Sequence, residues 1–461
     1  MKRAKFLPLR FVVVATLFIF CGCTASRDKS YQQLMNYAET VKVINTHEHQ
    51  RNPLDMGYKS YHFWVLLSNS YLNADVVSAG GKSFTLEQLN TGTPDEFWAS
   101  NGEYLSFCSQ TSYYGQFMEG IKKCYGYNEP AFTPEGIKTL SQQIENSYHN
   151  YAAWFDSCFQ QAGFETMLID QHWAPFNLET DKTYFRLVFP VNLLVSNIGN
   201  ARQVYTQQHH TFKTFSETTG IQQINSLDDY LHFADFMLQS AIKNGAVALK
   251  NSMAYSRSIY YENTPGEVAT ELFRKSPGLS SSENKALQDF MFHWFLRKAA
   301  EYELPMQIHT GYLAGNGNRL ENGHPIHLNS LFLQHPETRF DLFHGGFPWT
   351  GEFTALGKMF PNVYLNLVWL PQISKERAKV TFNEMLDTMP YNKILWGGDC
   401  HFIEEAVGSL EYGKQVVCEV LAERIAKNEM DITTAQKIIS AVFRENALQC
   451  FPRLLSKNQT Y

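Results

Sequence analysis

Two histidines separated by a single residue, His47 and His49, lie at the end of an apolar run that begins at Val43. On a β-strand, residues i and i+2 project from the same face, so both imidazoles can reach one metal ion while Glu48 points away. Neutral imidazole is a common ligand of divalent transition metals, zinc among them. A His-x-His pair alone is a weak signal, and its meaning depends on whether the rest of the chain supplies further ligands.

Eight segments are predicted to be strands, and predicted helices separate most of them. The strands are 41–46, 163–170, 184–195, 246–250, 304–309, 340–344, 363–367 and 394–397. Alternation of this kind predicts parallel βα units, and eight units predict an α/β fold, a closed (β/α)8 TIM barrel. An open, doubly wound sheet is the alternative, but no glycine-rich phosphate loop follows the first strand.

The C-terminal ends of the predicted strands carry metal ligands and acid–base groups. In a barrel these ends meet at one face, where catalytic groups gather. A single histidine after a strand is usually a polar residue of the core or rim. Here the strand ends carry, in chain order, His47 and His49, His172, Lys250, His309, His344 and Asp399. So many at once predict a shared site.

This ordered set resembles the amidohydrolase superfamily. Five motifs are similar to its amidohydrolase-related (amidohydrolase-2 type) branch, which includes the domain fused to glutamine-synthetase-like proteins: ALKNSMAYSR at 248–257, QIHTG at 307–311, FHGGFPW at 343–349, PNVYLNL at 361–367 and LWGGD at 395–399. The resemblance covers residues 40–50 and 240–450, and it implies a TIM barrel of the metal-dependent hydrolase type. The segment 50–150 is similar in size and place to the insertion of uronate isomerases, which are more distant relatives.

The resemblance implies a role for each ligand. His47, His49, His309 and Asp399 would hold one divalent cation, and imidazoles with a carboxylate suit Zn²⁺. Such a cation lowers the pKa of water and polarises a carbonyl group. Asp399 would act as general base and then general acid. His344 would bind the attacking water or hold a second metal ion.

Lys250 decides the number of metal ions. In related enzymes a lysine at this strand is carboxylated and bridges two ions; the alternatives are a solvated lysine or an anchor for a substrate carboxylate. Arg257 is a candidate for binding a substrate carboxylate, or a surface charge. His172 and Trp349 are candidates to line the pocket, with packing as the alternative for the tryptophan. One or two metal ions remain possible.

We expect a metal-dependent hydrolase that attacks an amide, ester or lactone bond of a small molecule. A sugar isomerase similar to uronate isomerases and a metal-dependent decarboxylase are alternatives with the same ligands. A surface lipoprotein that only binds its ligand is a further alternative, but a binding protein has no need of the full hydrolytic set. The net charge of −6 and the absence of a basic patch argue against a nucleic-acid partner. The sequence does not predict the oligomeric state.

The N-terminus predicts export. A basic segment to Arg10 and an apolar segment at 11–20 precede Cys21-Gly22-Cys23, an arrangement typical of a signal peptide (1–23) and similar to a bacterial lipobox. Cys23 would be lipidated, with 24–39 as a tether and short helix before the barrel at 40–461. This places the protein in the bacterial envelope, with the outer membrane favoured because position 24 is not Asp. An ordinary cleaved signal or an N-terminal anchor is the alternative.

The barrel segment has two further features. It contains a helical insertion at about 50–150, and C-terminal helices at about 403–452. Six cysteines lie outside the signal segment, with no CxxC motif, so no zinc knuckle or disulfide framework is predicted. Cys108 and Cys124 can pair within the insertion; the alternative is that all six are free.

Overall fold

Eight parallel strands form a single sheet in the order of the sequence. The computed structural model describes residues 27–196, 198 and 210–455. The strands are β1 (Val43–Glu48), β2 (Phe164–Asp170), β3 (Phe185–Pro190), β4 (Ala248–Asn251), β5 (Met306–Ile308), β6 (Phe340–Leu342), β7 (Val363–Asn366) and β8 (Ile394–Leu395). Backbone hydrogen bonds from Thr46 N to Trp396 O and from Asp399 N to His47 O join β1 to the chain around β8. The prediction of a (β/α)8 TIM barrel is confirmed.

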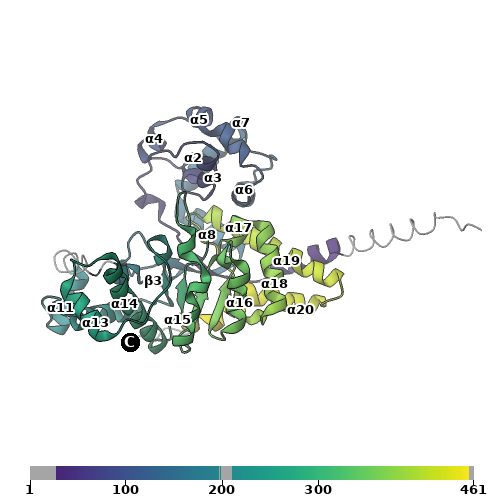
Figure 1. Ribbon diagram of the computed structural model, residues 1–461. Helices are drawn as coiled ribbons and strands as arrows, with labels where there is room; N and C mark the ends of the chain where they lie inside the picture. The colour runs from purple at the N-terminus through teal and green to yellow at the C-terminus, as the bar shows by residue number, and fades with distance from the viewer. Residues whose placement is uncertain (1–26, 197, 199–209, 456–461) are drawn as a thin grey trace, which may run out of the picture.

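Helices occupy most of the chain between and after the strands (Figure 1). They are α8 (Tyr151–Ala162), α9 (Asn192–Ser196), α11 (His210–Thr219), α12 (Leu227–Lys243), α13 (Gly266–Lys275), α14 (Ser281–Glu301), α15 (Asn329–Gln334), α16 (Thr350–Met359), α17 (Leu370–Ile373), α18 (Lys375–Thr388), α19 (Ile403–Ala426), α20 (Ile432–Ser440) and α21 (Asn446–Cys450). Capping boxes start α12 and α14, because Ser226 with Asp229 and Ser280 with Glu283 satisfy free amides of the first turn. Within the predicted segment 184–195, for which the sequence favours a strand core at 185–189 and a break at Pro190, the strand ends at Pro190 and α9 follows.

An irregularity in β1 decides which side chains point into the barrel. Asn45 of β1 pairs with Met167 of β2, and Glu48 pairs with Ile169. Between these two pairs β1 therefore spans three residues where β2 spans two, so β1 contains one extra residue. Because successive side chains of a strand point to opposite faces, an extra residue reverses the faces beyond it. Ile44 packs with the inward-facing residues of other strands, so a regular strand would have turned Glu48 inward. The irregularity brings the two histidines inward instead.

A mostly helical insertion follows β1, as predicted. It contains short 3-10 turn η1 (Pro53–Asp55) and helices α2 (Phe63–Ser68), α3 (Leu72–Ser78), α4 (Leu86–Thr91), α5 (Pro94–Phe107), α6 (Ser112–Tyr125) and α7 (Pro134–Tyr148). These helices bury a core of their own, rich in aromatic side chains such as Phe63, Trp64 and Phe117. Each such side chain contributes roughly 1.5–3 kcal/mol when fully buried. In Figure 1 the insertion stands above the barrel, and α6 reaches α19.

Two glycines allow α6 and α19 to pack closely. A Cβ atom at Gly120 would collide with the carbonyl oxygen of Glu404, and one at Gly408 with that of Gln116. The insertion is therefore fixed to the barrel by direct contact between helix backbones.

The predicted signal peptide (1–23), including Cys23, lies outside the described residues. Residues 27–38 are helical and lead into β1. Within the part of the chain that the structure describes, no helix has the length and apolar character needed to cross a membrane.

Candidate metal centre

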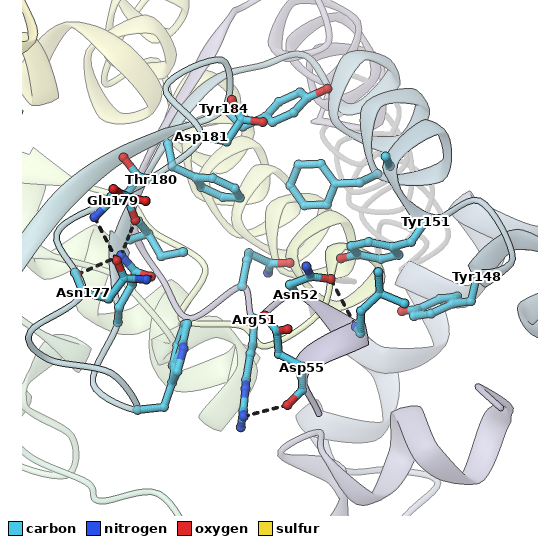
Figure 2. Close-up of a pocket in the computed structure, with 18 of the residues that line it drawn as sticks. Arg51, Asn52, Asp55, Tyr148, Tyr151, Asn177, Glu179, Thr180, Asp181 and Tyr184 are labelled. Carbon is cyan, nitrogen blue, oxygen red and sulfur yellow. Dashed lines mark hydrogen bonds between the residues drawn. The ribbon is translucent and has the colours of Figure 1, made fainter. Parts of the chain in front are cut away.

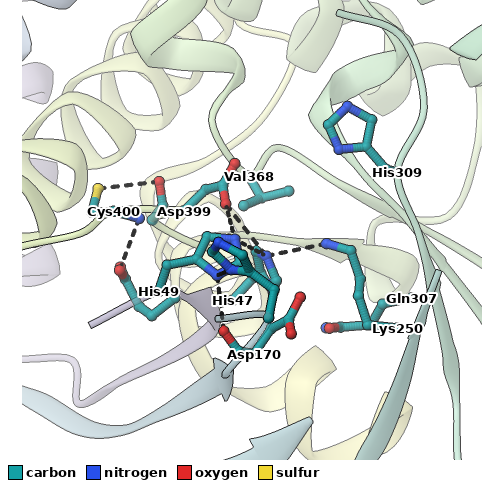
Figure 3. Close-up of polar contacts among 12 residues, drawn as sticks. His47, His49, Asp170, Lys250, Gln307, His309, Val368, Asp399 and Cys400 are labelled. Carbon is teal, nitrogen blue, oxygen red and sulfur yellow. Dashed lines mark hydrogen bonds and ion pairs between the residues drawn. The ribbon is translucent and has the colours of Figure 1, made fainter. Parts of the chain in front are cut away.

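Two strands bring three potential ligands together at the C-terminal end of the barrel. His47 lies in β1 and His49 directly after it, and Asp399 follows β8. Asp399 Oδ1 lies 3.3 Å from His47 Nε2 and 3.2 Å from His49 Nε2, and the two nitrogens are 3.2 Å apart. His47 is fully buried and Asp399 is 5% exposed. Figure 3 shows the three side chains converging.

The neighbours of His49 indicate which of its nitrogens carries the proton. Its Nδ1 lies 2.9 Å from the backbone carbonyl oxygen of Asp170. A carbonyl can only accept a hydrogen bond, so Nδ1 is protonated and the neutral ring turns the lone pair of Nε2 towards Asp399. Two acceptors at this distance repel each other unless a cation lies between them. This donor set fits a divalent metal ion.

The pKa shifts indicate the same demand for positive charge. Burial lowers the pKa of His49, but the adjacent Asp399 carboxylate outweighs burial and the net shift is upward. Burial raises the pKa of Asp399, but hydrogen bonds and charge from His47 and His49 hold it well below its usual range. Without a metal ion, a proton held between His49 and Asp399 would supply this positive charge.

Lys250 extends from β4 to His47. Its Nζ lies 3.1 Å from His47 Nε2 and 3.8 Å from the centre of the Phe343 ring. Burial lowers the pKa of Lys250 to about 8, although the charges of Asp170, Asp399 and Asp341 oppose this shift. A substantial fraction of this lysine is therefore the neutral amine just above neutral pH.

His309 and His344 form a second pair of facing acceptors. His309 Nε2 lies 2.7 Å from the Tyr312 carbonyl oxygen, and His344 Nδ1 lies 3.2 Å from that of Val368. Both of these nitrogens are therefore protonated, and His309 Nδ1 and His344 Nε2 face each other 3.0 Å apart with their lone pairs. Burial, with the charge of Lys250, lowers the pKa of His309 to about 3. His344 Nε2 is 4.0 Å from Asp399 Oδ2, so Asp399 lies between the two histidine pairs.

His309 is not grouped with the first pair, although the sequence predicts it as a ligand of the same ion. The group that contains His47, among the described residues with ligand atoms within 4.8 Å of one another, consists of His47, His49 and Asp399. The backbone that positions His344 and Asp399 has an unusual conformation. His344 and Asp399 have φ angles of 65° and 60°, a left-handed conformation that costs a residue other than glycine about 1 kcal/mol or more and is concentrated at functional sites.

Comparisons with known proteins agree with this geometry. The family model described as "Amidohydrolase" matches residues 277–453. Protein fluG of Emericella nidulans is 36% identical over 129 residues, which are 27% of this chain and only 15% of that protein.

Solved structures extend the likeness over nearly the whole chain. A putative metal-dependent hydrolase from Lactobacillus casei has a TM-score of 0.61 at 17% identity, over 92% of this chain and 99% of its own. Glucuronate isomerase from Caulobacter crescentus has a TM-score of 0.72 at 14% identity, over 94% and 96%. Uronate isomerase from Thermotoga maritima has 0.70 at 13%, over 92% and 97%. These structures share the fold of this chain, and the match to the amidohydrolase family model covers its C-terminal part, residues 277–453.

Glu48 holds together the two segments of the barrel that carry the candidate ligands. It is fully buried in the wall. Its carboxylate accepts hydrogen bonds from Asn45 Nδ2 at 2.6 Å, Gln50 Nε2 at 2.9 Å and the Cys400 amide at 2.9 Å. Burial raises its pKa to about 8, although these hydrogen bonds oppose the shift. Glu48 thus fastens the residue after Asp399 to the strand that carries the histidines.

Two further predicted pocket residues have other partners. Arg257 donates to Asp289 Oδ1 at 2.6 Å, and its guanidinium lies 4.7 Å from the Tyr261 ring centre. The Trp349 ring packs on His324 at 4.4 Å. Neither contact involves a candidate metal ligand, and a role of either side chain in substrate binding stays a prediction.

His172, in contrast, is close to the centre. Its Nδ1 lies 3.2 Å from His49 Nδ1, and it forms a second potential ligand group with His49 and Asp170. Asp170 was missed by the sequence analysis. It is the last residue of β2, so the same strand-end rule would have found it, and its buried Oδ1 has no hydrogen-bond partner among the described residues.

The insertion supplies an aromatic wall near the centre, which the sequence did not predict. The Tyr71 ring lies 4.6 Å from that of Trp369 and 5.7 Å from that of His401. Trp369 in turn lies 5.0 Å from His344. Tyr71 is therefore only one ring removed from a candidate ligand.

A cavity of about 600 Å³ lies beside the centre (Figure 2). The start of the insertion, the α7–α8 junction and the β2–β3 connection line it; its residues include Arg51, Asn52, Tyr148, Trp173 and Glu179. Gln50 and Gln171, which also line it, are the neighbours of His49 and His172 along the chain. No ligand of the centre lines this cavity.

Proposed function

We propose that this protein is a metal-dependent hydrolase of a small molecule with an amide, ester or lactone bond. The observation that carries the proposal is the arrangement of imidazoles around Asp399: His47 and His49 face one of its oxygens, and His344 faces the other. His47, His49 and Asp399 would hold one cation, and His309 and His344 would hold a second. Zn²⁺ suits these ligands.

The bound cation would supply Lewis acidity, which polarises a carbonyl group and lowers the pKa of water. The residues of the chain would do the rest. Asp399, whose pKa is held low, would accept the proton of the attacking water and pass it to the leaving group. His344, 4.0 Å from Asp399, would orient the water. The aromatic wall of Tyr71 and Trp369 would exclude bulk solvent.

Lys250 separates this proposal from its main competitor. With a pKa of about 8, the neutral amine can add carbon dioxide and release a proton, which yields a carbamate that can bridge two ions. A single ion would instead favour a sugar isomerase similar to uronate isomerases. The full-length likeness to two such enzymes, helical insertion included, supports this second candidate.

The test is metal counting on the purified full chain, combined with a substrate panel. We expect two zinc ions per chain after reconstitution, a carbon-13 NMR carbamate signal after incubation with labelled bicarbonate, and hydrolysis of an ester, lactone or amide. One zinc ion, no carbamate and isomerisation of a hexuronate would refute the hydrolase proposal in favour of the isomerase. A chain that binds no divalent metal would refute both.

We also propose that the protein is exported and anchored through a lipid on Cys23, in the outer membrane of a bacterial envelope. The basic, apolar and Cys-Gly-Cys segments of residues 1–23 support this. Labelled palmitate should enter the wild-type protein and not the Cys23→Ser variant. Equal labelling of both would disprove the anchor.

A further inference from the structure

Two cysteines from distant parts of the chain are in direct contact. Cys124 lies at the end of α6 in the insertion, and Cys158 lies in α8 next to the barrel. Their Sγ atoms are 3.8 Å apart. Cys158 is 4% exposed, whereas Cys124 is only partly buried. Cys124 is thus the more exposed of the two residues.

Neighbouring side chains fix this contact. The ring of Tyr125, the residue after Cys124, stacks on that of Trp154 at 4.9 Å. Trp154 lies four residues before Cys158 and therefore on the same face of α8. The Tyr125 hydroxyl and the Trp154 indole both donate to one oxygen of Glu404, at 2.6 and 2.9 Å. The two sulfurs are held together by this arrangement and do not meet by chance.

The other described cysteines lack such a partner. Cys108 donates to the Tyr104 carbonyl oxygen at 3.2 Å, so the pairing of Cys108 with Cys124 that the sequence allowed is not the one that the structure favours. Cys400 donates to the Gly398 carbonyl oxygen at 3.3 Å. Among the described residues, no second pair of cysteines forms a hydrogen-bonded sulfur contact.

We propose that Cys124 and Cys158 are a disulfide-forming pair that links the insertion covalently to the barrel. The oxidant would be a disulfide of the glutathione class. The Cys124 thiolate attacks one sulfur of the oxidant, which releases one thiol and leaves a mixed disulfide. The Cys158 thiolate then attacks Cys124 Sγ and releases the second thiol. Two cysteine thiols and one disulfide become one protein disulfide and two thiols, and the protons of the cysteines pass to the leaving thiols.

The cross-link would form while the chain folds. Hydrogen bonding with Cys158 and burial raise the pKa of the Cys124 thiol well above its usual range, so the folded protein contains little of the reactive thiolate. During folding both thiols are solvated and reactive, and the packing of α6 on α8 then brings them together.

The test is to refold the reduced full-length chain with reduced and oxidised glutathione, alkylate the remaining thiols and map the peptides. We expect the peptides of Cys124 and Cys158 to be joined in the wild type. The Cys158→Ser variant should instead carry glutathione on Cys124. Cys418→Ser, which removes a buried cysteine of α19, is the matched control and should keep the cross-link.

A second readout is the thermal stability of the refolded protein. A reducing agent should lower the thermal unfolding midpoint of the oxidised wild type and leave that of the Cys124→Ser/Cys158→Ser double variant unchanged, because a cross-link restricts the unfolded chain. The proposal fails if both cysteines of the refolded wild type are still alkylated, or if Cys124 is joined to Cys108 instead.

Discussion

Two buried carboxylates, Asp399 and Glu404, lie five residues apart and have opposite surroundings. Glu404 is 2% exposed and accepts hydrogen bonds from Tyr125 Oη at 2.6 Å, Trp154 Nε1 at 2.9 Å and Tyr148 Oη at 3.1 Å. Asp399 is about as buried but faces the imidazole nitrogens of His47 and His49 at 3.2–3.3 Å. One carboxylate is surrounded by donors and the other by acceptors.

The difference separates a structural carboxylate from a functional one. A buried acceptor that receives enough donors needs no further partner, and it holds together the elements that supply them. Glu404 does this for α6, α7 and α8, which all contact it. A buried acceptor surrounded by other acceptors needs a cation from outside the chain. The partners of a buried acidic group thus indicate its role better than its burial does.

The largest expected effect is on turnover. Asp399→Asn removes the proposed base and one metal ligand, and we expect the rate of hydrolysis to fall by about 1,000-fold, or about 4 kcal/mol in the activation barrier. The same variant should bind less zinc, as measured by plasma mass spectrometry. Glu404→Gln is the matched control and should keep its metal. Equal metal loss in both variants would remove the distinction between the two carboxylates.

The next effect is on stability. Glu404→Ala leaves two hydroxyls and an indole N–H without their acceptor, and we expect the free energy of unfolding to fall by about 3 kcal/mol. Glu404→Gln keeps one acceptor oxygen and should lose about 1 kcal/mol. Urea unfolding followed by tryptophan fluorescence measures both.

Metal removal is a third way to distinguish the roles of Asp399 and Glu404. A ligand present at 100 times its dissociation constant stabilises the folded state by about 2.7 kcal/mol. Treatment with a chelator should therefore lower the thermal midpoint of the wild type and of Glu404→Gln, and addition of Zn²⁺ should restore it. Asp399→Asn should respond to neither. A wild-type midpoint that does not change on chelation would mean that the acceptors are satisfied by protons alone.

The sequence predicted the barrel and the members of the centre because strand ends follow from chain order. His47, His49, His309, His344 and Asp399 each sit at such an end. It predicted that His47 and His49 share one face with Glu48 pointing away, but not the backbone features that aim these side chains. The left-handed backbone at His344 and the irregularity in β1 are local responses to packing. The spacing of residues in the sequence does not predict either of them.

Contacts between distant helices could not be predicted from the sequence, for a different reason. Arg257 looked like a substrate anchor, but its partner Asp289 lies in α14, thirty-two residues further along the chain. Glu404 attracted no attention, because its three donors come from 250 or more residues earlier. Such partners are set by how helices pack against the barrel, and in a single sequence they are not visible.

A histidine pair outside the centre gives the smallest and last test. His293 Nδ1 lies 2.7 Å from His335 Nε2, a contact that resembles that of His309 and His344. Here the other nitrogen of His293, Nε2, has no hydrogen-bond partner in the described structure, so His293 Nδ1 can carry the proton and donate to His335, and no cation is required. Burial, with the charges of His293 and Arg297, lowers the pKa of His335 from 6.5 to about 4.

The sign of the pH effect follows from this shift. Between pH 6.5 and 4 the unfolded chain binds a proton that the folded chain does not, so the stabilisation is complete above pH 6.5 and is lost as the pH falls towards 4. We expect a loss of about 1 kcal/mol between pH 7 and 5 after allowance for solvent screening. Urea unfolding with a chelator present throughout measures it without a contribution from metal release. His335→Gln should lose less over the same range; an equal loss would mean that the titrating group lies elsewhere.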